Sequence, residues 1–187
     1  MAEKRKNWNG LISGFKASDL VFLDESGCNT DMTRRYAYSL GGSRAVDSAP
    51  LSKPKNTTIL SSIQLDGTLR YTTFSGGTTV ERFKRYLETD LLPHLNGNSV
   101  LIMDNMKSHH ARAVKNLLDS SGVRYIYLPP YSPDLNPIKK LWSKVKAFLR
   151  KFKARTLDAL PNAIQNAFHS VTVSDCSGWF RFCGYAL

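Results

Sequence analysis

The chain has 187 residues, 42% of them hydrophobic and 22% charged, and a formal net charge of +11. This length suits one domain with a substantial core, and the positive charge points to an anionic partner, most simply nucleic acid. No apolar run approaches the ~18 residues of a membrane span, the N-terminus lacks the apolar core of a signal peptide, and the three cysteines make neither a complete disulfide framework nor a zinc site. We therefore expect an intracellular protein.

The N-terminal half of the chain favours strands. Residues 20–26 (LVFLDES) form a short apolar run that ends in acidic residues, which predicts a buried strand. Residues 34–40 and 57–74 are rich in β-branched and aromatic residues, which predicts further strands. The Asp66-Gly67 pair inside the second of these segments indicates a hairpin turn.

Helices and strands then alternate. Apolar spacing predicts a helix over 78–95, and the following segments are a strand over 99–104, a helix over 109–122, a strand over 123–130, and a helical region from Pro137 to about Phe168 with a break near Pro161. Strands followed by alternating helices and strands predict an α/β fold, with a mixed sheet flanked by helices.

The start of the last helical region carries an unexpected residue. Asn136 is a favourable N-cap and Pro137 suits the first helical position. Lys139 then occupies the third position, where a glutamate would complete a capping box and where the helix dipole disfavours a cation. The sequence thus places a lysine where local helix chemistry favours Glu.

Two carboxylates follow buried apolar strands. Asp24 comes after VFL, and Asp104 comes after VLIM. Ligands of open α/β sheets gather at strand ends, so either residue could hold a metal or act as a base, although many strands simply end in a polar residue. Their neighbours Glu25 and Asn105 could support them or belong to the loops alone.

Histidines offer a weaker alternative. His109 and His110 begin a predicted helix, and we interpret them as cap and surface residues. Ser26, His109 and Asp104 could be combined into a hydrolase triad, but no nucleophile-elbow motif supports that combination.

The helix after Pro137 carries much of the positive charge. Eight basic residues lie between Lys139 and Arg155, and no acidic residue interrupts them. A solvated basic face is the alternative to a phosphate-binding face. The residues predicted to contact DNA are Lys140, Lys144, Lys146, Arg150 and Lys151.

Taken together, these segments resemble a known family. The runs FLDESG, DMTRRYAYSLGG, IMDNMKSHH and YLPPYSPDLNPIKKLWSKVKAFLRK, in this order, are similar to the catalytic domain of bacterial insertion-sequence transposases of the mariner-like DDE class. The resemblance implies a ribonuclease-H-like fold with a five-stranded mixed sheet over residues 20–187, after a linker remnant over 1–19. Because only 23 residues precede Asp24, we expect the family's helix-turn-helix DNA-binding region to be absent.

The resemblance also implies a chemistry. Three acidic residues of the family bind two Mg²⁺ or Mn²⁺ ions and drive DNA cleavage and strand transfer, and Asp24 and Asp104 match the first two. The family's third acid is a Glu separated from the second by 34 residues, and here that position is Lys139. We therefore expect Asp24 and Asp104 as metal ligands and an impaired catalytic position at Lys139.

Two functions stay open at this point. One is a DNA transposase or endonuclease, weakened by Lys139. The other is a non-catalytic DNA-binding domain with the transposase fold. The resemblance implies DNA as the partner, a homodimer in a transposition complex, and a nucleoid-associated place in a bacterial cytoplasm. Lys139→Glu is expected to restore cleavage and, through the capping box, to add a little stability.

Overall fold

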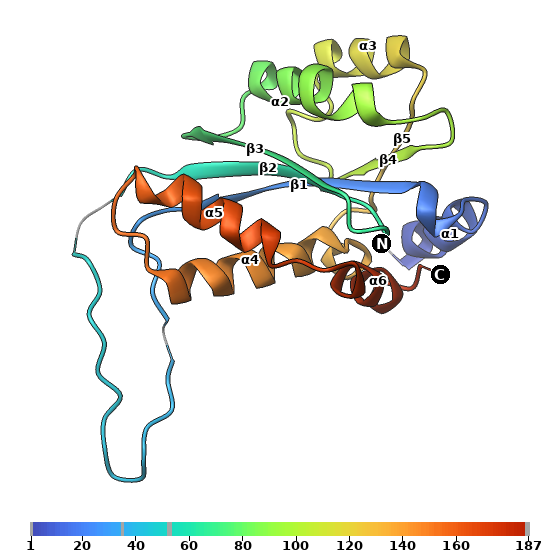
Figure 1. The fold of residues 1–187 in the computed structure, drawn as a ribbon. Helices are drawn as coiled ribbons and strands as arrows, with labels where there is room; N and C mark the ends of the chain where they lie inside the picture. The colour runs from blue at the N-terminus through green and yellow to red at the C-terminus, as the bar shows by residue number, and fades with distance from the viewer. Residues whose placement is uncertain (1, 35, 52–53, 186–187) are drawn as a thin grey trace.

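A five-stranded sheet forms the centre of the computed structural model, which describes residues 2–34, 36–51 and 54–185 (Figure 1). The strands are β1 (Leu20–Cys28), β2 (Thr57–Ile63), β3 (Leu69–Ser75), β4 (Val100–Met103) and β5 (Arg124–Tyr127), in the order β3-β2-β1-β4-β5. β1 pairs antiparallel with β2 and parallel with β4, β2 pairs antiparallel with β3, and β4 pairs parallel with β5. The predicted mixed five-stranded sheet is confirmed.

The turn between β2 and β3 forms as the Asp66-Gly67 pair predicts. Gly67 has φ +88°, a backbone conformation that glycine adopts without a side-chain penalty. The Asp66 carboxylate accepts a hydrogen bond from the Thr68 backbone N–H at 2.8 Å, which fixes the turn locally.

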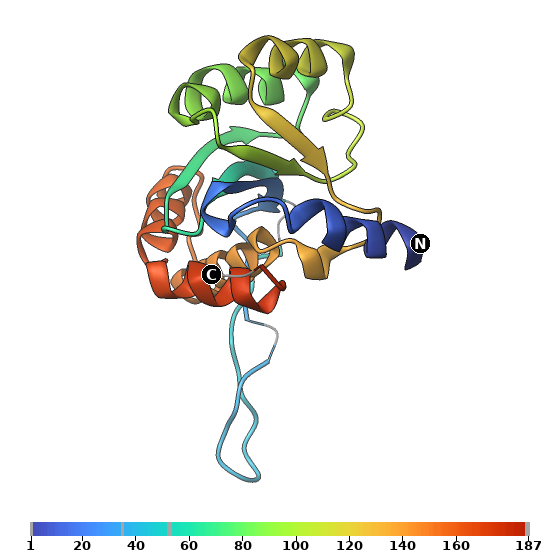
Figure 2. The same cartoon turned by 90° about the vertical axis from the view of Figure 1, so that its right-hand side faces the viewer.

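The described residues form six α-helices, which lie around the sheet. They are α1 (Ala2–Ile12), α2 (Val80–Tyr86), α3 (Arg112–Ser121), α4 (Ile138–Phe152), α5 (Ala159–His169) and α6 (Val173–Phe182). α2 and α3 cover one face of the sheet, and α4, α5 and α6 cover the other (Figures 1 and 2). α2 continues through a π-helical turn and a 3-10 turn to His94, so the predicted helix over 78–95 is confirmed. No helix within the described ranges is long and apolar enough to cross a membrane.

Alternate residues of β1 face two separate cores, because successive strand side chains point to opposite faces. Val21 and Leu23 pack in the core beneath α2 and α3. Phe22 packs in the core beneath α4 and α6, where its ring lies edge-on to Phe180 at 5.4 Å. The same alternation directs Asp24 toward α4 and Glu25 toward the opposite face.

The segment before β1 takes part in the packing. Its helix α1 is not indicated by the apolar spacing of the sequence. Trp8 is nevertheless only 3% exposed and belongs to the core on the α4 side. A single buried tryptophan in a polar stretch gives no periodic signal, so sequence patterning does not find this helix.

The strand predicted over 34–40 is wrong. The described residues between β1 and β2 contain no strand, and they form a long loop that projects away from the sheet (Figures 1 and 2). Tyr36, Tyr38 and Leu40 are 91%, 106% and 88% exposed. Their β-favouring side chains find no neighbouring strand to pair with, and strand propensity depends on such packing.

The start of α4 differs in one detail from the prediction. Pro137 has helical dihedrals (φ −55°, ψ −32°) and Asn136 is extended, so the helix begins where expected. The Asn136 side chain, however, forms no capping hydrogen bond, and its Oδ1 is buried without a partner among the described residues. The Lys139 N–H instead donates to the Asn136 backbone carbonyl at 3.1 Å. A side-chain cap at Asn136 is therefore wrong.

The helix break also lies earlier than predicted. α4 ends at Phe152, and the next residue, Lys153, takes the left-handed conformation with φ +56°. Pro161 is in the first turn of α5, where a missing N–H removes no intrahelical hydrogen bond. The proline therefore starts a helix here and does not break one.

Candidate functional site

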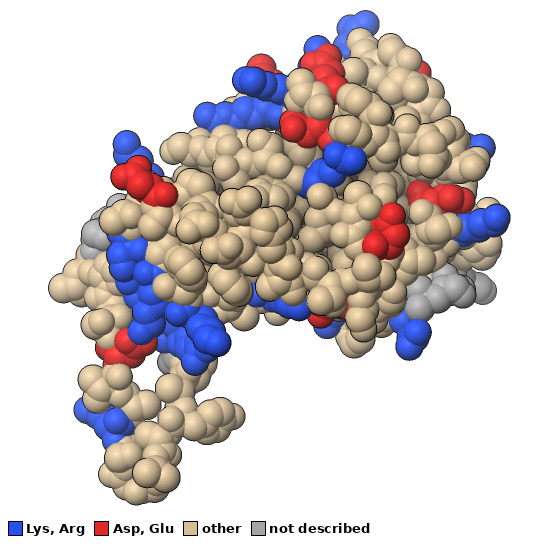
Figure 3. Space-filling model, viewed as in Figure 1, with Lys and Arg blue, Asp and Glu red and all other residues tan. Residues whose placement is uncertain are grey.

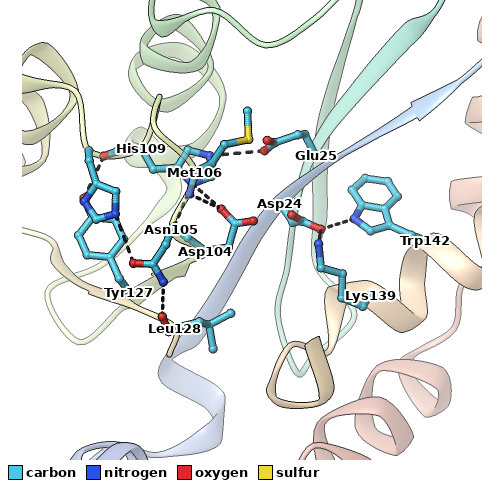
Figure 4. A network of polar contacts seen from close by, with 11 residues as sticks. Asp24, Glu25, Asp104, Asn105, Met106, His109, Tyr127, Leu128, Lys139 and Trp142 are labelled. Carbon is cyan, nitrogen blue, oxygen red and sulfur yellow. Dashed lines mark hydrogen bonds and ion pairs between the residues drawn. The ribbon is translucent and has the colours of Figure 1, made fainter. Parts of the chain in front are cut away.

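Asp24 and Asp104 meet at one edge of the sheet. β1 and β4 are parallel neighbours with Leu23 opposite Met103, so the next residue on each strand is an aspartate at the same level. Figure 4 shows both carboxyl groups near this edge, with Asp104 on the side of α3 and Asp24 on the side of α4. The structure thus brings together two of the three residues that the sequence selects.

Lys139 completes the group, and it does so as a cation. Its Nζ donates to Asp24 Oδ2 at 2.7 Å, and Trp142 Nε1 donates to the same oxygen at 2.8 Å (Figure 4). Both residues come from the first turns of α4, one turn apart on the face that covers the sheet. The carboxylate of Asp24 is 2% exposed, whereas the Lys139 side chain is 39% exposed. The ammonium therefore covers a buried carboxylate from the solvent side.

The charge of Asp24 is only partly compensated. Burial raises the pKa of its carboxyl group above the ordinary value, although attraction by Lys139 and hydrogen bonds from Lys139 and Trp142 act in the opposite direction. Desolvation of a buried ion commonly exceeds what one partner returns. A positive charge next to Asp24 therefore stabilises its ionised form, and Lys139 supplies that charge.

The second aspartate is held by a buried histidine. His109 Nδ1 lies 3.0 Å from Asp104 Oδ1, and its Nε2 lies 3.4 Å from Glu25 Oε2. The ring is fully buried and stacks on Phe83 with the ring centres 4.3 Å apart. His109 thereby lies within ion-pair distance of both Asp104, which follows β4, and Glu25 on β1.

This contact shapes the electrostatics of the pair. Desolvation lowers the pKa of His109, but hydrogen bonds and attraction from Asp104 and Glu25 outweigh it and raise the pKa to about 9. Burial acts to raise the pKa of Asp104, but His109, the Met106 N–H and Lys139 together hold it below its ordinary value. An imidazolium between two carboxylates is the consistent charge state at neutral pH.

The interpretation of His109 as a helix cap is wrong. α3 begins only at Arg112, and the three residues before it are turn and loop. His110 does lie nearer the surface, where its ring stacks on Tyr127 with the centres 4.1 Å apart. The sequence signal was the spacing from Asp104, which suffices for the loop to fold back and bring His109 to the carboxylate.

The loop after β4 is fixed to its neighbour strand. Asn105 Nδ2 donates to the Leu128 carbonyl at 2.5 Å, and Tyr127 OH donates to the His109 carbonyl at 2.9 Å. These contacts join the two ends of β4 and β5 that border the site. Asn105 is therefore a structural support of this edge, one of the two roles left open for it.

The donor set does not fit a two-metal centre. Asp24 and Asp104 offer the hard oxygen ligands that Mg²⁺ and Mn²⁺ prefer, but Lys139 has only hydrogen-bond donors. No group of three or more His, Cys, Asp or Glu residues suited to a metal ion occurs among the described residues. Lys139 therefore offers a metal ion no ligand and places a positive charge beside the Asp24 carboxylate.

The predicted DNA-contacting residues fall into two groups. Lys144 is 2.5 Å from Asp175 Oδ2 on α6, and Lys140 lies 3.7 Å from the centre of the Phe182 ring. In contrast, Lys146, Arg150 and Lys151 form no ion pair with any described residue. Figure 3 shows lysine and arginine side chains gathered below the end of α4, next to the long loop.

The family of the chain is shown by comparison with known proteins. The model of the DDE superfamily endonuclease family matches residues 19–161, most of the chain, and the chain belongs to this family. The transposable element Tc1 transposase of Caenorhabditis elegans is 28% identical over 97 residues, which cover 50% of this chain and 36% of that protein.

Solved structures show the same fold. The pre-cleavage Mos1 transpososome is 21% identical with a TM-score of 0.81, and the match covers 96% of this chain and 58% of that chain. The catalytic domain of Mos1 mariner transposase is 16% identical with a TM-score of 0.70, covering 96% and 85%. The predicted ribonuclease-H-like fold is therefore confirmed. The chain spans about a third of the Tc1 protein and somewhat over half of the Mos1 chain in the transpososome.

Proposed function

We propose that this chain is the catalytic-fold domain of a transposase that binds DNA and whose metal-dependent cleavage is disabled by Lys139. The observation that carries the proposal is the 2.7 Å contact between Lys139 Nζ and Asp24 Oδ2. In the resemblance stated above, residue 139 is the position of the third acid. The Lys139 ammonium neutralises Asp24, the first acid, whereas a Glu at position 139 would bind metal together with Asp24.

The charge argument supports loss of cleavage. Two-metal cleavage uses ions about 4 Å apart that are held by carboxylates and stabilise the attacking and leaving oxygens. A unit charge and a divalent ion at about 4 Å interact by roughly 8 kcal/mol at an effective dielectric of 20, and for Lys139 this interaction is repulsive. The lysine stem can turn toward solvent, which reduces the repulsion, but the ligand stays missing. We therefore infer that the parent chain does not cleave DNA, and that substitution of Lys139 by Glu is needed for cleavage.

DNA is the proposed partner. The net charge of +11 and the unpaired basic side chains of α4 support an electrostatic phosphate contact. One similar structure is a Mos1 paired-end complex with the left transposon end, and others are paired-end complexes with Mn and with Mg. We infer DNA binding for this chain and, from its four motifs, membership of the bacterial insertion-sequence branch.

A second copy of the chain is a further proposed partner. The long loop between β1 and β2 exposes apolar residues, namely Leu40, Val46 and Leu51 at 88%, 87% and 103%. Exposed apolar groups on a projecting segment are typical of protein contacts. Light scattering of the parent and of a Leu40→Ser, Val46→Ser variant tests this, and an identical mass for both at high concentration counts against it.

Nicking of supercoiled plasmid tests the function. With Mn²⁺ present, the parent should bind DNA without cutting it, and Lys139→Glu should gain cleavage. Lys139→Met is the matched control, because it removes the cation without supplying an oxygen ligand, and it should stay inactive. Asp24→Asn combined with Lys139→Glu should abolish the gained cleavage. Parent cleavage equal to that of Lys139→Glu, and lost in Asp24→Asn, would show that Lys139 does not disable the site.

A further inference from the structure

We propose that the base of the long loop and the end of α4 form a binding site for an unpaired stretch of a DNA strand. The site lies apart from Asp24 and Asp104, and its principal residues are Arg34, Tyr36, Arg150 and Lys151. The inference rests on the proposed function in one respect, namely that the partner is DNA. The inference adds that this part of the surface binds the DNA strand, and that the strand is unpaired there.

The two arms of the loop are fastened at this place. Arg155 Nη1 donates to the carbonyls of Thr30 and Met32 at 3.1 and 3.2 Å, which holds the outgoing arm. Lys153 Nζ contacts both carboxylate oxygens of Asp47 at 2.5 and 2.6 Å, which holds the returning arm. Both cations follow the end of α4. The base of the loop is therefore positioned against that helix end, although the rest of the loop projects away from it (Figure 1).

Two adjoining hollows lie between the loop and α4. The larger, of about 880 Å³, is bordered by Arg34, Tyr36 and Arg150. The smaller, of about 320 Å³, is bordered by Arg34, Tyr36 and Lys151. Because Arg34 and Tyr36 border both hollows, the two adjoin at the loop base, and we treat them together as the path of the proposed strand.

The charge of this path suits phosphate. Arg34, Arg150 and Lys151 line it and form no ion pair with any described residue. Two acids also line it, and one of them, Asp47, is already paired with Lys153. Figure 3 shows the basic side chains gathered at this end of α4 and along the adjoining loop. Arginine and lysine placed along a groove are the usual means of following a nucleic-acid backbone.

Tyr36 indicates that the strand is unpaired. Tyr36 is 91% exposed, and it lines both hollows together with Arg34. An aromatic face among phosphate-binding cations can stack on a base, and stacking needs a base whose face is not covered by its neighbours in a duplex. A purely apolar partner would leave the surrounding arginines without a counter-charge, so the chemistry favours a nucleic-acid strand over a hydrophobic peptide.

Fluorescence anisotropy with two dye-labelled DNAs tests the site, one a single strand and one a duplex, each of about 15 nucleotides per strand. Tyr36→Ala should weaken single-strand binding about fivefold or more, the range expected for loss of a stacked base, and leave duplex binding nearly unchanged. Tyr38→Ala is the matched control, because it removes an equally exposed ring that borders neither hollow. It should change neither affinity.

A second pair of variants tests the phosphate contacts. Arg150→Gln should weaken single-strand binding and reduce its dependence on salt, whereas Arg112→Gln, on α3 across the sheet, should not. A single strand that carries 5-iodouracil should form a photo-crosslink to Tyr36. Unchanged affinity in Tyr36→Ala and Arg150→Gln, with DNA bound normally, would overturn this site and leave the proposed function standing. Failure of the parent to bind either DNA would instead overturn the proposed function.

Discussion

Lys139 and Asp24 form an ion pair at the end of the central sheet, with Nζ and Oδ2 2.7 Å apart. The carboxylate is almost fully buried and the ammonium is partly open to solvent. The chemistry of the family is expected to use a group of carboxylates that bind metal ions. In this chain, the buried carboxylate of Asp24 is instead paired with the ammonium of Lys139. Substitution of Lys139 should therefore change both the stability of the fold and the ability of Asp24 to bind a metal ion.

Substitution of Lys139 should lower stability. Lys139→Met leaves the Asp24 charge buried with only Trp142 donating to it among the described side chains. It should reduce the free energy of unfolding by roughly 2 kcal/mol, less than the loss from a fully buried pair, because the Lys139 side chain is 39% exposed. Lys139→Glu should cost more, because it adds a like charge beside Asp24. The gain of stability expected from a restored capping box is thus revised, since Asn136 does not cap the helix. Urea unfolding without metal measures this, with Lys146→Gln as the control that should change little.

Salt dependence should separate the two groups of basic residues on α4. Replacing Lys146, Arg150 and Lys151 by Gln should flatten the log–log slope of DNA affinity against salt by about 2 to 3, because each phosphate contact contributes about 0.9. Lys140→Gln with Lys144→Gln should change the slope much less, since these side chains contact Phe182 and Asp175. Equal effects from both sets would mean that the internal contacts do not compete with DNA.

Removal of the buried imidazole should loosen the second carboxylate. His109→Phe retains the stack on Phe83 but leaves Asp104 and Glu25 without the imidazolium that lies between them. A buried pair that loses one partner typically costs 3–5 kcal/mol, so we expect a loss of about 3 kcal/mol in chemical denaturation. His110→Phe, which keeps a ring beside Tyr127, is the matched control. Similar stability of both variants would rule out a structural role for the His109 contacts.

The start of α6 should give a pH-dependent contribution to stability. Lys144 donates to Asp175, which also completes a capping box with Thr172, and these bonds hold the pKa of Asp175 below its ordinary value. Because the pKa is lower in the folded state, this stability is present above about pH 4 and is lost as pH falls through the folded pKa. Asp175→Asn should lower Tm by about 2–4 °C at pH 7 and by nearly nothing near pH 2. Asp158→Asn, before α5 and without a capping bond, should be neutral at both pH values.

Features fixed by nearby residues were predictable from the sequence. The hairpin follows from Asp66-Gly67, and Asp24 and Asp104 follow from acids placed after apolar strands that pair in parallel. The position of residue 139 at the start of α4 follows from the Asn136-Pro137 pair. In each case the local backbone preference and the hydrophobic pattern agree with the fold, so the long-range structure did not have to be known.

Features that depend on distant partners were not predictable. Residues 34–40 have strand composition but find no strand beside them, and only the fold decides that. His109 contacts Glu25, which is far away in the sequence and reaches it from β1. Lys144 is likewise paired with Asp175 on α6, so it is less available to DNA than the run of basic residues on α4 suggests.

Binding of Mn²⁺ measures the central claim most directly. The parent and Lys139→Glu would be titrated with Mn²⁺ and followed by electron paramagnetic resonance and by Tm, each beside its Asp24→Asn counterpart. With a resident ammonium on Asp24, the parent should leave Mn²⁺ free and keep its Tm, whereas Lys139→Glu should bind the ion and rise in Tm in a manner that Asp24→Asn abolishes. Stoichiometric Mn²⁺ binding by the parent, lost in its Asp24→Asn variant, would contradict the conclusion that Lys139 closes the site.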